Sequence, residues 1–325
     1  MPIIGIDVSK HKLHSAYLVD AQRGKVHTKA ASNDASGYQQ LLTWAQRQTG
    51  QGPEALHVIL EATGVYHEAP AEAFYKAGAR VSVVNPAQVH HFARSRGIHT
   101  KNDAHDRRVL ALYGAERAPQ AWQPMSPELK RLRSLLARLE ALEQDIQRES
   151  NRREQARTRG ESEVLASIAT VVATLEQEHA RLRREIDNHI DAHPQLRHDR
   201  ELLESVPGIG EKLGPHLLVV LRSHDFRRAS QLAAYLGLAV RQHHSGTSVH
   251  RPARLTKCGH RHLRAMLYYP ALTALRYNPD ILALGERLKR YGKASKARIG
   301  AAMRKLVHIA FGVFKNQTPY VPQSP

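Results

Sequence analysis

The amino-acid sequence predicts a chain of three parts. These are an α/β domain over residues 1–122, two long amphipathic helices over residues 123–192, and a basic, mainly helical domain over residues 193–325. Three observations support the division: short apolar segments alternate with helical patterns in the first part, leucines recur every three or four residues in the second, and positive charge is concentrated in the third. A chain of 325 residues is long enough for two or more domains.

The first part combines strand and helix patterns in an informative order. Helical patterns extend over DASGYQQLLTWAQRQ, YHEAPAEAFYKAG and residues 103–117, and the second of them ends at Gly78, where a glycine commonly terminates a helix. Short apolar or alternating segments predict strands at PIIGIDV, KLHSAYLVD, KVHTKAAS, ALHVILEATG and RVSVVNP. The resulting order, βββαβαβα, is that of the RNase H fold, so we expect a mixed sheet covered by helices.

The second part has the spacing of long amphipathic helices. Its first apolar series has the spacing of a coiled-coil seam and consists of Leu129, Leu132, Leu136 and Leu139. A polar stretch over residues 147–163 interrupts the pattern, and a second series follows at Val164, Ile168, Val171, Leu175, Leu182, Ile186 and Ile190. Spacing alone leaves open a hairpin or an interrupted rod, and a spacer or a dimerisation arm.

The net charge of +18 is concentrated in the last part, because residues 1–120 contribute +4, residues 121–192 contribute −1 and residues 193–325 contribute +15. We therefore expect a polyanionic partner there, nucleic acid above all, rather than a merely solvated surface. The single cysteine, Cys258, excludes an internal disulfide and a cysteine-based zinc site, and it favours a reducing cytoplasm.

No targeting or membrane segment is predicted. No apolar run reaches the roughly 18 residues of a membrane span, so we expect no membrane partner. The N-terminus MPIIGIDVSKHK lacks the basic and apolar regions of a signal peptide. The C-terminal segment NQTPYVPQSP has no periodic pattern and is expected to fray.

Four carboxylates of the first part are candidates for a metal site. Asp7 lies inside the first apolar strand, where an unpartnered charge is costly, and Glu61 ends another apolar strand. Asp103 and Asp106 are three residues apart at a helix start and so share one face. In an RNase H-type sheet these positions converge. Two Mg²⁺ ions, with Mn²⁺ as the alternative, would offset a repulsion of about 4 kcal/mol per close pair.

Each acid also has a structural explanation. Asp103 could cap its helix, Asp106 could interact with the helix dipole, and Glu61 could be a solvated strand end. An actin-like sugar kinase also begins with a strand that carries an aspartate. The sequence lacks the second phosphate-contacting Asp-x-Gly and the Gly-Gly adenosine loop of such kinases, so this class is disfavoured.

Two segments of the last part are typical of nucleic-acid contacts. In LLESVPGIGEKLGPHLL, the residues Gly208, Gly210 and Lys212 lie between two apolar helical segments, which is the pattern of a helix-hairpin-helix; a plain helical turn is the alternative. A second cluster is typical of a phosphate footprint and consists of Arg241, Arg251, Arg254, Lys257, Arg261 and Arg264. The nearby His260 and His262 lack a zinc-ligand pattern.

The stretch RQHHSGTSVHRPAR, residues 241–254, allows two interpretations. It could be a turn between two elements and nothing more. Alternatively, Ser245 could be a nucleophile held beside cations that bind a phosphate, in a loop made flexible by Gly246. Taken alone, the stretch favours the turn.

In their order along the chain, these motifs resemble the DEDD transposases of bacterial insertion sequences, the group that includes the Piv-type invertases and the bridge-RNA-guided recombinases. The matching segments run from residue 3 to about residue 315 and are IGIDVSK, LEATGVY, VSVVNPAQ, KNDAHD, LLESVPGIGEKLG, LAAYLGL, SGTSV, LTKCGHRHLR and AMRKL. No single motif decides the resemblance, but the ordered set is highly specific.

The resemblance implies a RuvC-like N-terminal domain, a coiled-coil connection and a C-terminal transposase domain. It carries the family's acidic tetrad onto Asp7, Glu61, Asp103 and Asp106, and the family's serine nucleophile onto Ser245. Such a recombinase uses Mg²⁺, forms a covalent serine–DNA intermediate, and selects donor and target DNA through an element-encoded noncoding guide RNA. Together with the coiled coil, this chemistry favours a homo-oligomer, a dimer or a tetramer, in which Ser245 meets the acidic site in cis or in trans.

The chain departs from the family pattern at several flanking positions. Asn102 replaces the usual threonine before Asp103, Arg107 replaces the usual alanine after the last acid, and residues 239–241 are Ala-Val-Arg where Thr-Pro-Arg is common. The acids and the serine are unaffected, whereas the residues that flank them differ from the family pattern. A hydrolytic RuvC-like junction nuclease and a non-enzymatic nucleic-acid-binding protein stay open as alternatives.

Overall fold

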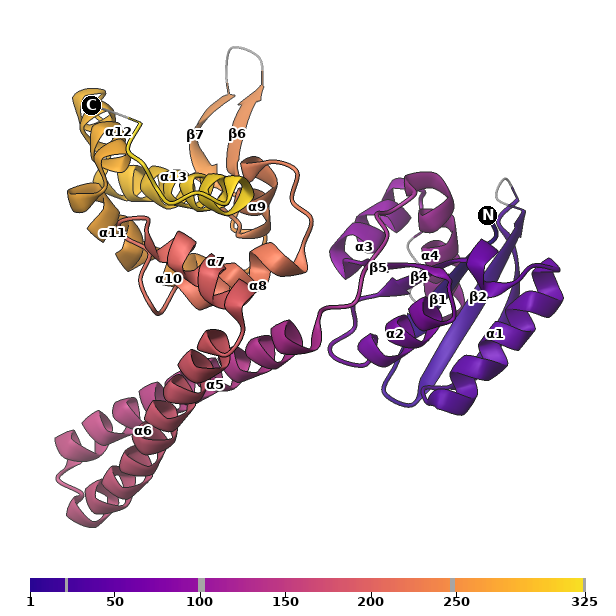
Figure 1. The fold of residues 1–325 in the computed structure, drawn as a ribbon, viewed down its shortest axis with the longest axis horizontal. Helices are drawn as coiled ribbons and strands as arrows, with labels where there is room; N and C mark the ends of the chain where they lie inside the picture. The colour runs from indigo at the N-terminus through magenta and orange to yellow at the C-terminus, as the bar shows by residue number, and fades with distance from the viewer. Residues whose placement is uncertain (21–22, 99–102, 246–248, 324–325) are drawn as a thin grey trace. The chain divides into compact units, whose positions relative to one another are not determined.

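The computed structural model describes residues 1–20, 23–98, 103–245 and 249–323. Contacts between residues divide the chain into two compact units, Met1–Pro124 and Met125–Pro325 (Figure 1). The long helices expected over residues 123–192 group with the C-terminal unit. No helix in the described ranges is long and apolar enough to cross a membrane.

The N-terminal unit is built on a five-stranded mixed sheet with the order β3-β2-β1-β4-β5. The central strand β1 pairs antiparallel with β2 and parallel with β4. This arrangement is consistent with the RNase H-like domain that the order of elements predicts. The strands are β1 (Ile3–Val8), β2 (Lys12–Asp20), β3 (Lys25–Ser32), β4 (His57–Glu61) and β5 (Arg80–Val84).

Side-chain alternation along the strands gives the sheet two different apolar faces. One face carries Ile6 and Leu60, which share a cluster with the residues of α1 (Ala35–Thr49) and α2 (Glu68–Lys76). The opposite face carries Ile59, which shares a cluster with residues of α3 (Pro86–Ser95) and α4 (Asp103–Arg117). Helices therefore cover both faces, and α4 covers the face that carries the odd-numbered positions of β1 and β4.

The helix α3 is absent from the sequence-based expectation. It begins at a strong local signal, because Pro86 occupies its first turn and the Asn85 side chain accepts a hydrogen bond of 2.8 Å from the Ala87 amide. The expected helix end at Gly78 is confirmed, since this glycine has a φ of 94° and donates its amide to the Tyr75 carbonyl. A short 3-10 turn, η1 (Pro53–Ala55), precedes β4.

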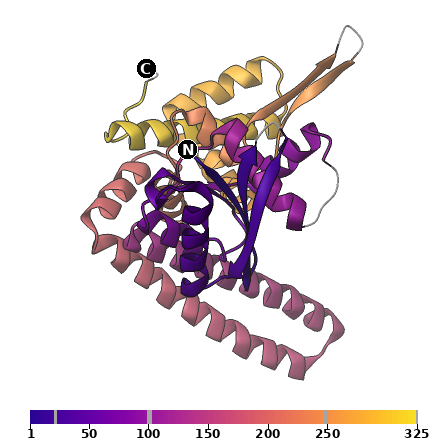
Figure 2. The same ribbon diagram turned by 90° about the vertical axis from the view of Figure 1, so that its right-hand side faces the viewer.

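Two long helices, α5 (Pro127–Arg159) and α6 (Ser162–Asp191), form an antiparallel hairpin (Figures 1 and 2). Gly160 ends α5 in the left-handed conformation with a φ of 72°. An ion pair of 3.3 Å joins Arg131 near the start of α5 to Glu185 near the end of α6. The two helices therefore form a hairpin and not an interrupted rod, the two arrangements that their spacing left open.

The hairpin buries most of the expected apolar positions. Leu132 and Ile190 are fully buried in one cluster with the rest of the C-terminal core. Near the tip, however, Val164 and Val171 of the second predicted series are exposed, and Val172 is buried in their place. The apolar stripe therefore rotates around α6 toward the tip, because a straight helix turns every 3.6 residues rather than every 3.5.

The rest of the C-terminal unit packs seven helices and one β-hairpin around a continuous apolar core within the described residues. The strands β6 (Val240–Ser245) and β7 (Val249–Leu255) pair antiparallel in a segment that we expected to be a turn in a mainly helical domain. The helices are α7 (Pro194–Glu204), α8 (Gly214–Ser223), α9 (Ala229–Tyr235), α10 (Arg261–Met266), α11 (Tyr268–Tyr277), α12 (Pro279–Arg290) and α13 (Ser295–Asn316).

The C-terminal segment is anchored, contrary to the expectation of fraying. The Tyr320 hydroxyl donates a hydrogen bond of 2.6 Å to the Asp280 carboxylate, and the Tyr320 amide donates one of 2.9 Å to the Ser205 hydroxyl. Burial, and then the hydrogen bond to the Asp280 carboxylate, raise the pKa of Tyr320 to about 12. These contacts join residues far apart in sequence, which a local pattern cannot indicate.

Candidate functional site

Asp7 and Glu61 end two neighbouring parallel strands on the same face of the sheet. In the register of β1 and β4, Ile6 pairs with Leu60, so the two acids follow at equivalent positions. Side chains two residues apart on a strand share a face. Gly5 and Ile59 both face α4. A Cβ added at Gly5 would meet the backbone of α4, and a Cβ added at Gly114 of α4 would meet the Ile59 side chain. The acids therefore lie on the α4 side of the sheet.

The helix α4 crosses this face with its acidic end toward Asp7. A Cβ added at Gly114 would lie 3.0 Å from Ile3, whereas one added at Gly5 would lie 2.5 Å from the Arg107 carbonyl oxygen. The helix thus runs from the Asp7 end of β1 toward its start. A strand rises about 3.3 Å per residue and a helix about 1.5 Å. Asp7 is two residues beyond Gly5 on β1, so the part of α4 that lies beside it is formed by residues 103–106.

These carboxylates have the donor chemistry that Mg²⁺ prefers, since the ion takes oxygen ligands. Asp7, Glu61 and Asp106 are each half-buried. Asp103 begins α4, but its side chain lies outside the described residues. Within the described part of the chain, no group of three or more His, Cys, Asp or Glu side chains is arranged to hold a metal ion. The residues fit a Mg²⁺ site in donor type and in placement along the sheet.

Sequence reasoning missed a contact between an arginine and a histidine beside these acids. His14 on β2 is the cross-strand partner of Asp7, and the Nη1 group of Arg107 lies 3.4 Å from the Nδ1 atom of His14. The buried Nε group of Arg107 has no hydrogen-bond partner among the described residues. The arginine at this position was noted as a departure from the family pattern, but only the crossing of α4 over the sheet brings it to His14.

Ser245 ends β6 and pairs in register with Val249, at the end of the ladder opposite to the Val240–Leu255 pair. Its side chain and residues 246–248 lie outside the described residues, as does the side chain of Arg251. Arg241 and Arg254 are both exposed and form a cross-strand pair further along the hairpin. The hairpin thus carries two exposed cations on the strand ladder that leads to Ser245, and the register of the ladder shifts between Arg241 and His243.

The remaining predicted basic residues divide into two kinds. Lys257 and Arg261 are exposed. Arg264 is half-buried, and its Nη1 group donates a hydrogen bond of 3.0 Å to the Lys257 carbonyl. A Cβ added at Gly237 would meet the same guanidinium. Arg264 therefore has a structural contact that its sequence context did not indicate.

The segment Gly208–Lys212 connects α7 to α8. Gly208 has a φ of 107°, and an added Cβ would lie 2.8 Å from both Ala274 and the Pro270 carbonyl oxygen, so this glycine is required for packing against α11. Around Gly210, in contrast, the space is open. Glu211 forms an ion pair of 2.7 Å with Arg183 of α6. A phosphate contact at this turn stays a prediction.

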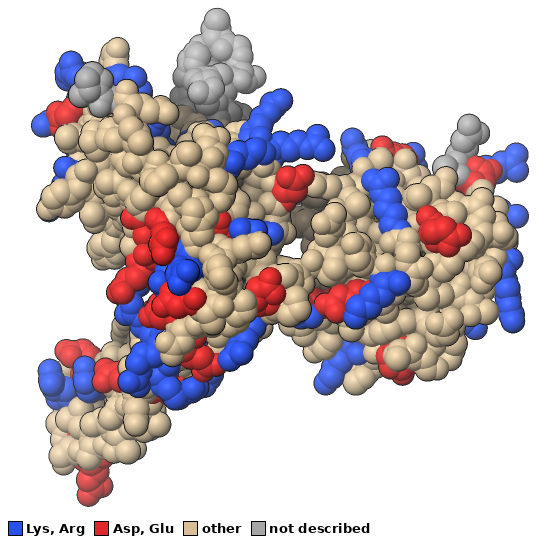
Figure 3. Space-filling model, in the orientation of Figure 1, with Lys and Arg blue, Asp and Glu red and all other residues tan. Residues whose placement is uncertain are grey.

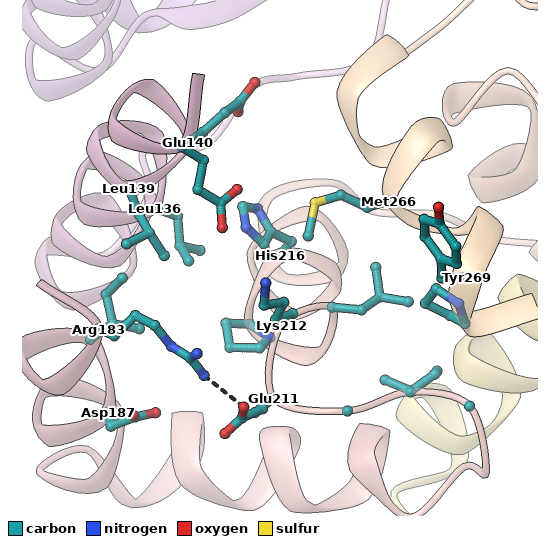
Figure 4. A pocket seen from close by; sticks show the side chains of 18 of the residues that line it. Leu136, Leu139, Glu140, Arg183, Asp187, Glu211, Lys212, His216, Met266 and Tyr269 are labelled. Carbon is teal, nitrogen blue, oxygen red and sulfur yellow. Dashed lines mark ion pairs between the residues drawn. The ribbon is translucent and has the colours of Figure 1, made fainter. Parts of the chain in front are cut away.

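A pocket of about 580 Å³ lies between this turn, the α5–α6 hairpin and α11, and Lys212 projects into it (Figure 4). Burial, and then the nearby His262, lower the pKa of His216 in its wall to about 4, so the ring is neutral at pH 7. Nδ1 of His262 lies 3.0 Å from the Glu140 carboxylate. The pocket wall therefore joins the hairpin to the domain core through polar contacts.

Comparison with known proteins connects both units to DNA rearrangement. A family model described as "Transposase" matches residues 4–156, and a model of the "Transposase IS116/IS110/IS902 family" matches residues 200–286. The chain is 34% identical to the pilin gene-inverting protein of Moraxella bovis over 98% of this chain and 97% of that protein. It belongs to the IS110 family of transposases. The family consists of DNA recombinases, so the chain is an enzyme of DNA recombination that binds DNA.

Other relatives agree with this assignment to the IS110 family. The pilin gene-inverting protein of Moraxella lacunata is 34% identical over 98% of this chain and 97% of its own length. An uncharacterised 43.6 kDa protein of the IS110 element from Streptomyces coelicolor is 26% identical over 50% of this chain and 39% of its own length. The first matched range of the transposase contains the four acids, and the second contains Ser245.

Proposed function

We propose that this IS110-family transposase cuts and exchanges DNA strands with Ser245 as nucleophile and Mg²⁺ held by Asp7, Glu61, Asp103 and Asp106. The observation that carries the proposal is the common face of Asp7 and Glu61, with the acidic start of α4 directed toward Asp7. Acids clustered at one end of a sheet suit a divalent cation better than a structural role, because nearby carboxylates repel.

The proposed step is a transfer of the DNA phosphate to the serine. The Oγ atom of Ser245 attacks the phosphorus, an Oγ–P bond forms, and the P–O bond to one deoxyribose breaks. The serine gives up its proton, and the released deoxyribose oxygen takes one up. When bound, Mg²⁺ neutralises charge on the phosphate oxygens. Exposed Arg241 and Arg254 would hold neighbouring phosphates on the β-hairpin.

Arg107 would assist at the acidic end of the sheet. Its guanidinium lies beside His14, and its Nε group lacks a hydrogen-bond partner within the described residues. The Nε group itself is buried, so a phosphate oxygen would bind the Nη groups of this half-buried side chain, since arginine binds phosphate through paired N–H groups. The role proposed for Arg107 is thus to orient the DNA phosphate.

The partners proposed are donor DNA, target DNA and an element-encoded guide RNA, in a homo-oligomer. The net charge of +15 over residues 193–325 supports a large polyanionic ligand. The exposed apolar Val164 and Val171 near the tip of the α5–α6 hairpin support self-association there. Structured noncoding DNA beside the reading frame, with loops complementary to the insertion junction, is the observation that tests guidance by RNA.

The decisive experiment compares Ser245→Ala with Ser248→Ala, a matched substitution three residues further along the chain. We expect Ser245→Ala to abolish strand exchange and the covalent protein–DNA adduct on a denaturing gel while DNA binding persists. Ser248→Ala should retain both. If Ser245→Ala cleaves DNA at the wild-type rate without an adduct, the protein is a hydrolytic junction nuclease instead.

A mixing experiment determines whether the serine and the acids act in the same copy. Ser245→Ala protein and Asp7→Asn protein are each expected to be inactive. Strand exchange restored by mixing them indicates that one copy supplies the serine and another the acids. No restoration, in a mixture shown to co-assemble, indicates that both belong to one copy.

A further inference from the structure

A groove of about 690 Å³ lies between α12 and α13, apart from the candidate site residues described above. Its volume is within the range of about 300–1,000 Å³ that is usual for ligand sites. Four of its lining residues can bind a ligand through charge or through an aromatic ring. They are Arg287, Arg290 and Tyr291 at the end of α12, and Lys305 on α13.

The three cations of this groove have no ion-pair partner in the described part of the chain. The one acid in the lining, Asp280, is only 7% exposed. Its carboxylate already accepts hydrogen bonds from the Tyr320 hydroxyl at 2.6 Å and from the Gln323 amide at 3.3 Å. The residues of the groove therefore do not neutralise its positive charge, and this charge can bind phosphate groups.

Tyr291 gives the groove an aromatic surface as well. Its side chain is 74% exposed, and within the described residues its ring makes no contact with another ring. An exposed aromatic ring beside a cationic groove is the arrangement with which proteins bind unpaired bases, because every base can stack on such a ring.

The surface around the groove is positively charged as well. Residues 279–316, which form α12, α13 and their connection, contain nine Lys and Arg but only two acids. In the space-filling view, Lys and Arg side chains gather over the α12 end of the C-terminal unit (Figure 3). A polyanion would thus be attracted to this end of the unit before it reaches the groove.

We infer that the α12–α13 groove binds a single-stranded segment of nucleic acid, with phosphates on Arg287, Arg290 and Lys305 and an unpaired base on Tyr291. A duplex would gain little from Tyr291, because its bases are already stacked on one another. Single-stranded RNA and single-stranded DNA offer the same phosphates and bases, so the chemistry of the groove suits both. The inference is independent of the Ser245 chemistry, since binding requires neither the serine nor the metal.

Binding of labelled oligonucleotides to the full chain tests the inference. Fluorescence anisotropy in EDTA would be measured with single-stranded RNA, single-stranded DNA and duplex DNA of one sequence. We expect Tyr291→Leu to weaken single-strand binding by about 5- to 150-fold, the range of a lost base–aromatic stack. Tyr291→Phe should bind as the wild type does, and duplex binding should be unchanged. Equal effects on RNA and DNA indicate a general site, and a larger effect on one identifies the natural strand.

The salt dependence of binding separates the groove from general attraction. Each phosphate contact to a single strand contributes about 0.7 to the slope of log K against log salt. We expect Arg287→Gln with Arg290→Gln to lower the slope by about 1.4, whereas Lys289→Gln, on the same helix but outside the groove lining, should leave it unchanged.

Tyr277 is the matched aromatic control, because it is 70% exposed on α11 and does not line the groove. Equal losses for Tyr277→Leu and Tyr291→Leu, or single-strand binding by Tyr291→Leu within twofold of the wild type, would overturn the inference. Both tyrosines are on the surface, so circular dichroism should show unchanged folding of both variants.

Discussion

Gly5 of β1 lies directly beneath Arg107 of α4: a Cβ added at Gly5 would be 2.5 Å from the Arg107 carbonyl oxygen and 2.5 Å from the Ala111 amide nitrogen. Backbone therefore contacts backbone at this crossing, and no flexible side chain is available to yield. The same contact sets how closely the acidic start of α4 approaches the sheet face that carries Asp7.

We expect Gly5→Ala to lower the free energy of unfolding by about 1–3 kcal/mol, the usual cost of overpacking a core. Because α4 must shift, strand exchange should fall further than the loss of folded protein explains. Urea unfolding and an activity assay on the folded fraction would measure both. Gly312→Ala on α13, where an added Cβ meets open space, should instead be neutral or slightly stabilising.

Removal of single acids tests the metal site without an activity assay. We expect saturating Mg²⁺ to stabilise the wild type by about 2–3 kcal/mol, as for a ligand at roughly 100 times its dissociation constant. Asp7→Asn and Asp106→Asn should lose this increase in thermal stability. Asp20→Asn, at the opposite end of the sheet, should retain it. A rise in melting temperature that is identical in all four proteins contradicts the assignment of the ligands.

The buried ion pair of the C-terminal unit is expected to be expensive to break. Asp199 is fully buried, and its carboxylate lies 2.5 Å from Nε of Arg222. We expect Arg222→Met to lower the free energy of unfolding by about 3 kcal/mol, because an uncompensated charge stays buried. Adding Asp199→Leu should recover much of this loss. Arg181→Met, which removes exposed ion pairs with Glu178 and Glu185, should lower the free energy of unfolding much less.

His57 gives the N-terminal unit a defined acid sensitivity. Burial, and then the nearby Arg80 and the N-terminal amine, lower its pKa from 6.5 to about 4. Between these values the unfolded chain binds a proton that the folded chain does not, so the free energy of unfolding falls as the pH falls. From pH 6.5 to 5 the wild type should lose about 2 kcal/mol more than His57→Gln, measured by urea unfolding at each pH.

The local sequence pattern predicted those helices and strands whose signal lies within a single segment of the chain. The five strands of the N-terminal unit, α4 and the two long helices have apolar or alternating patterns within their own segments, and all are present. The β-hairpin of residues 240–255 was missed as sheet because its strands are rich in Arg and His rather than in β-branched or aromatic residues. The anchoring of Tyr320 depends on Asp280, forty residues away, and no local signal encodes it.

In the candidate site, too, some residues could be identified from a local pattern and others only from the tertiary fold. Asp7 and Glu61 were identifiable because a charge in or after an apolar strand is unusual. His14 and Arg107 were not, since their proximity arises from the pairing of β1 with β2 and from the crossing of α4, which the sequence of neither segment specifies. Gly208 was noticed as part of a nucleic-acid motif, whereas its packing against α11 requires the tertiary fold.

The antiparallel pairing of α5 with α6 also restricts how this protein can change during evolution. Each turn of one helix packs against a turn of the other, as the Arg131–Glu185 ion pair and the contact between Glu143 and His179 illustrate. An insertion into α5 alone would shift every later residue out of step with α6. Lengthening or shortening therefore requires matched changes on both sides of Gly160, so related transposases should differ here by paired insertions or deletions of similar size.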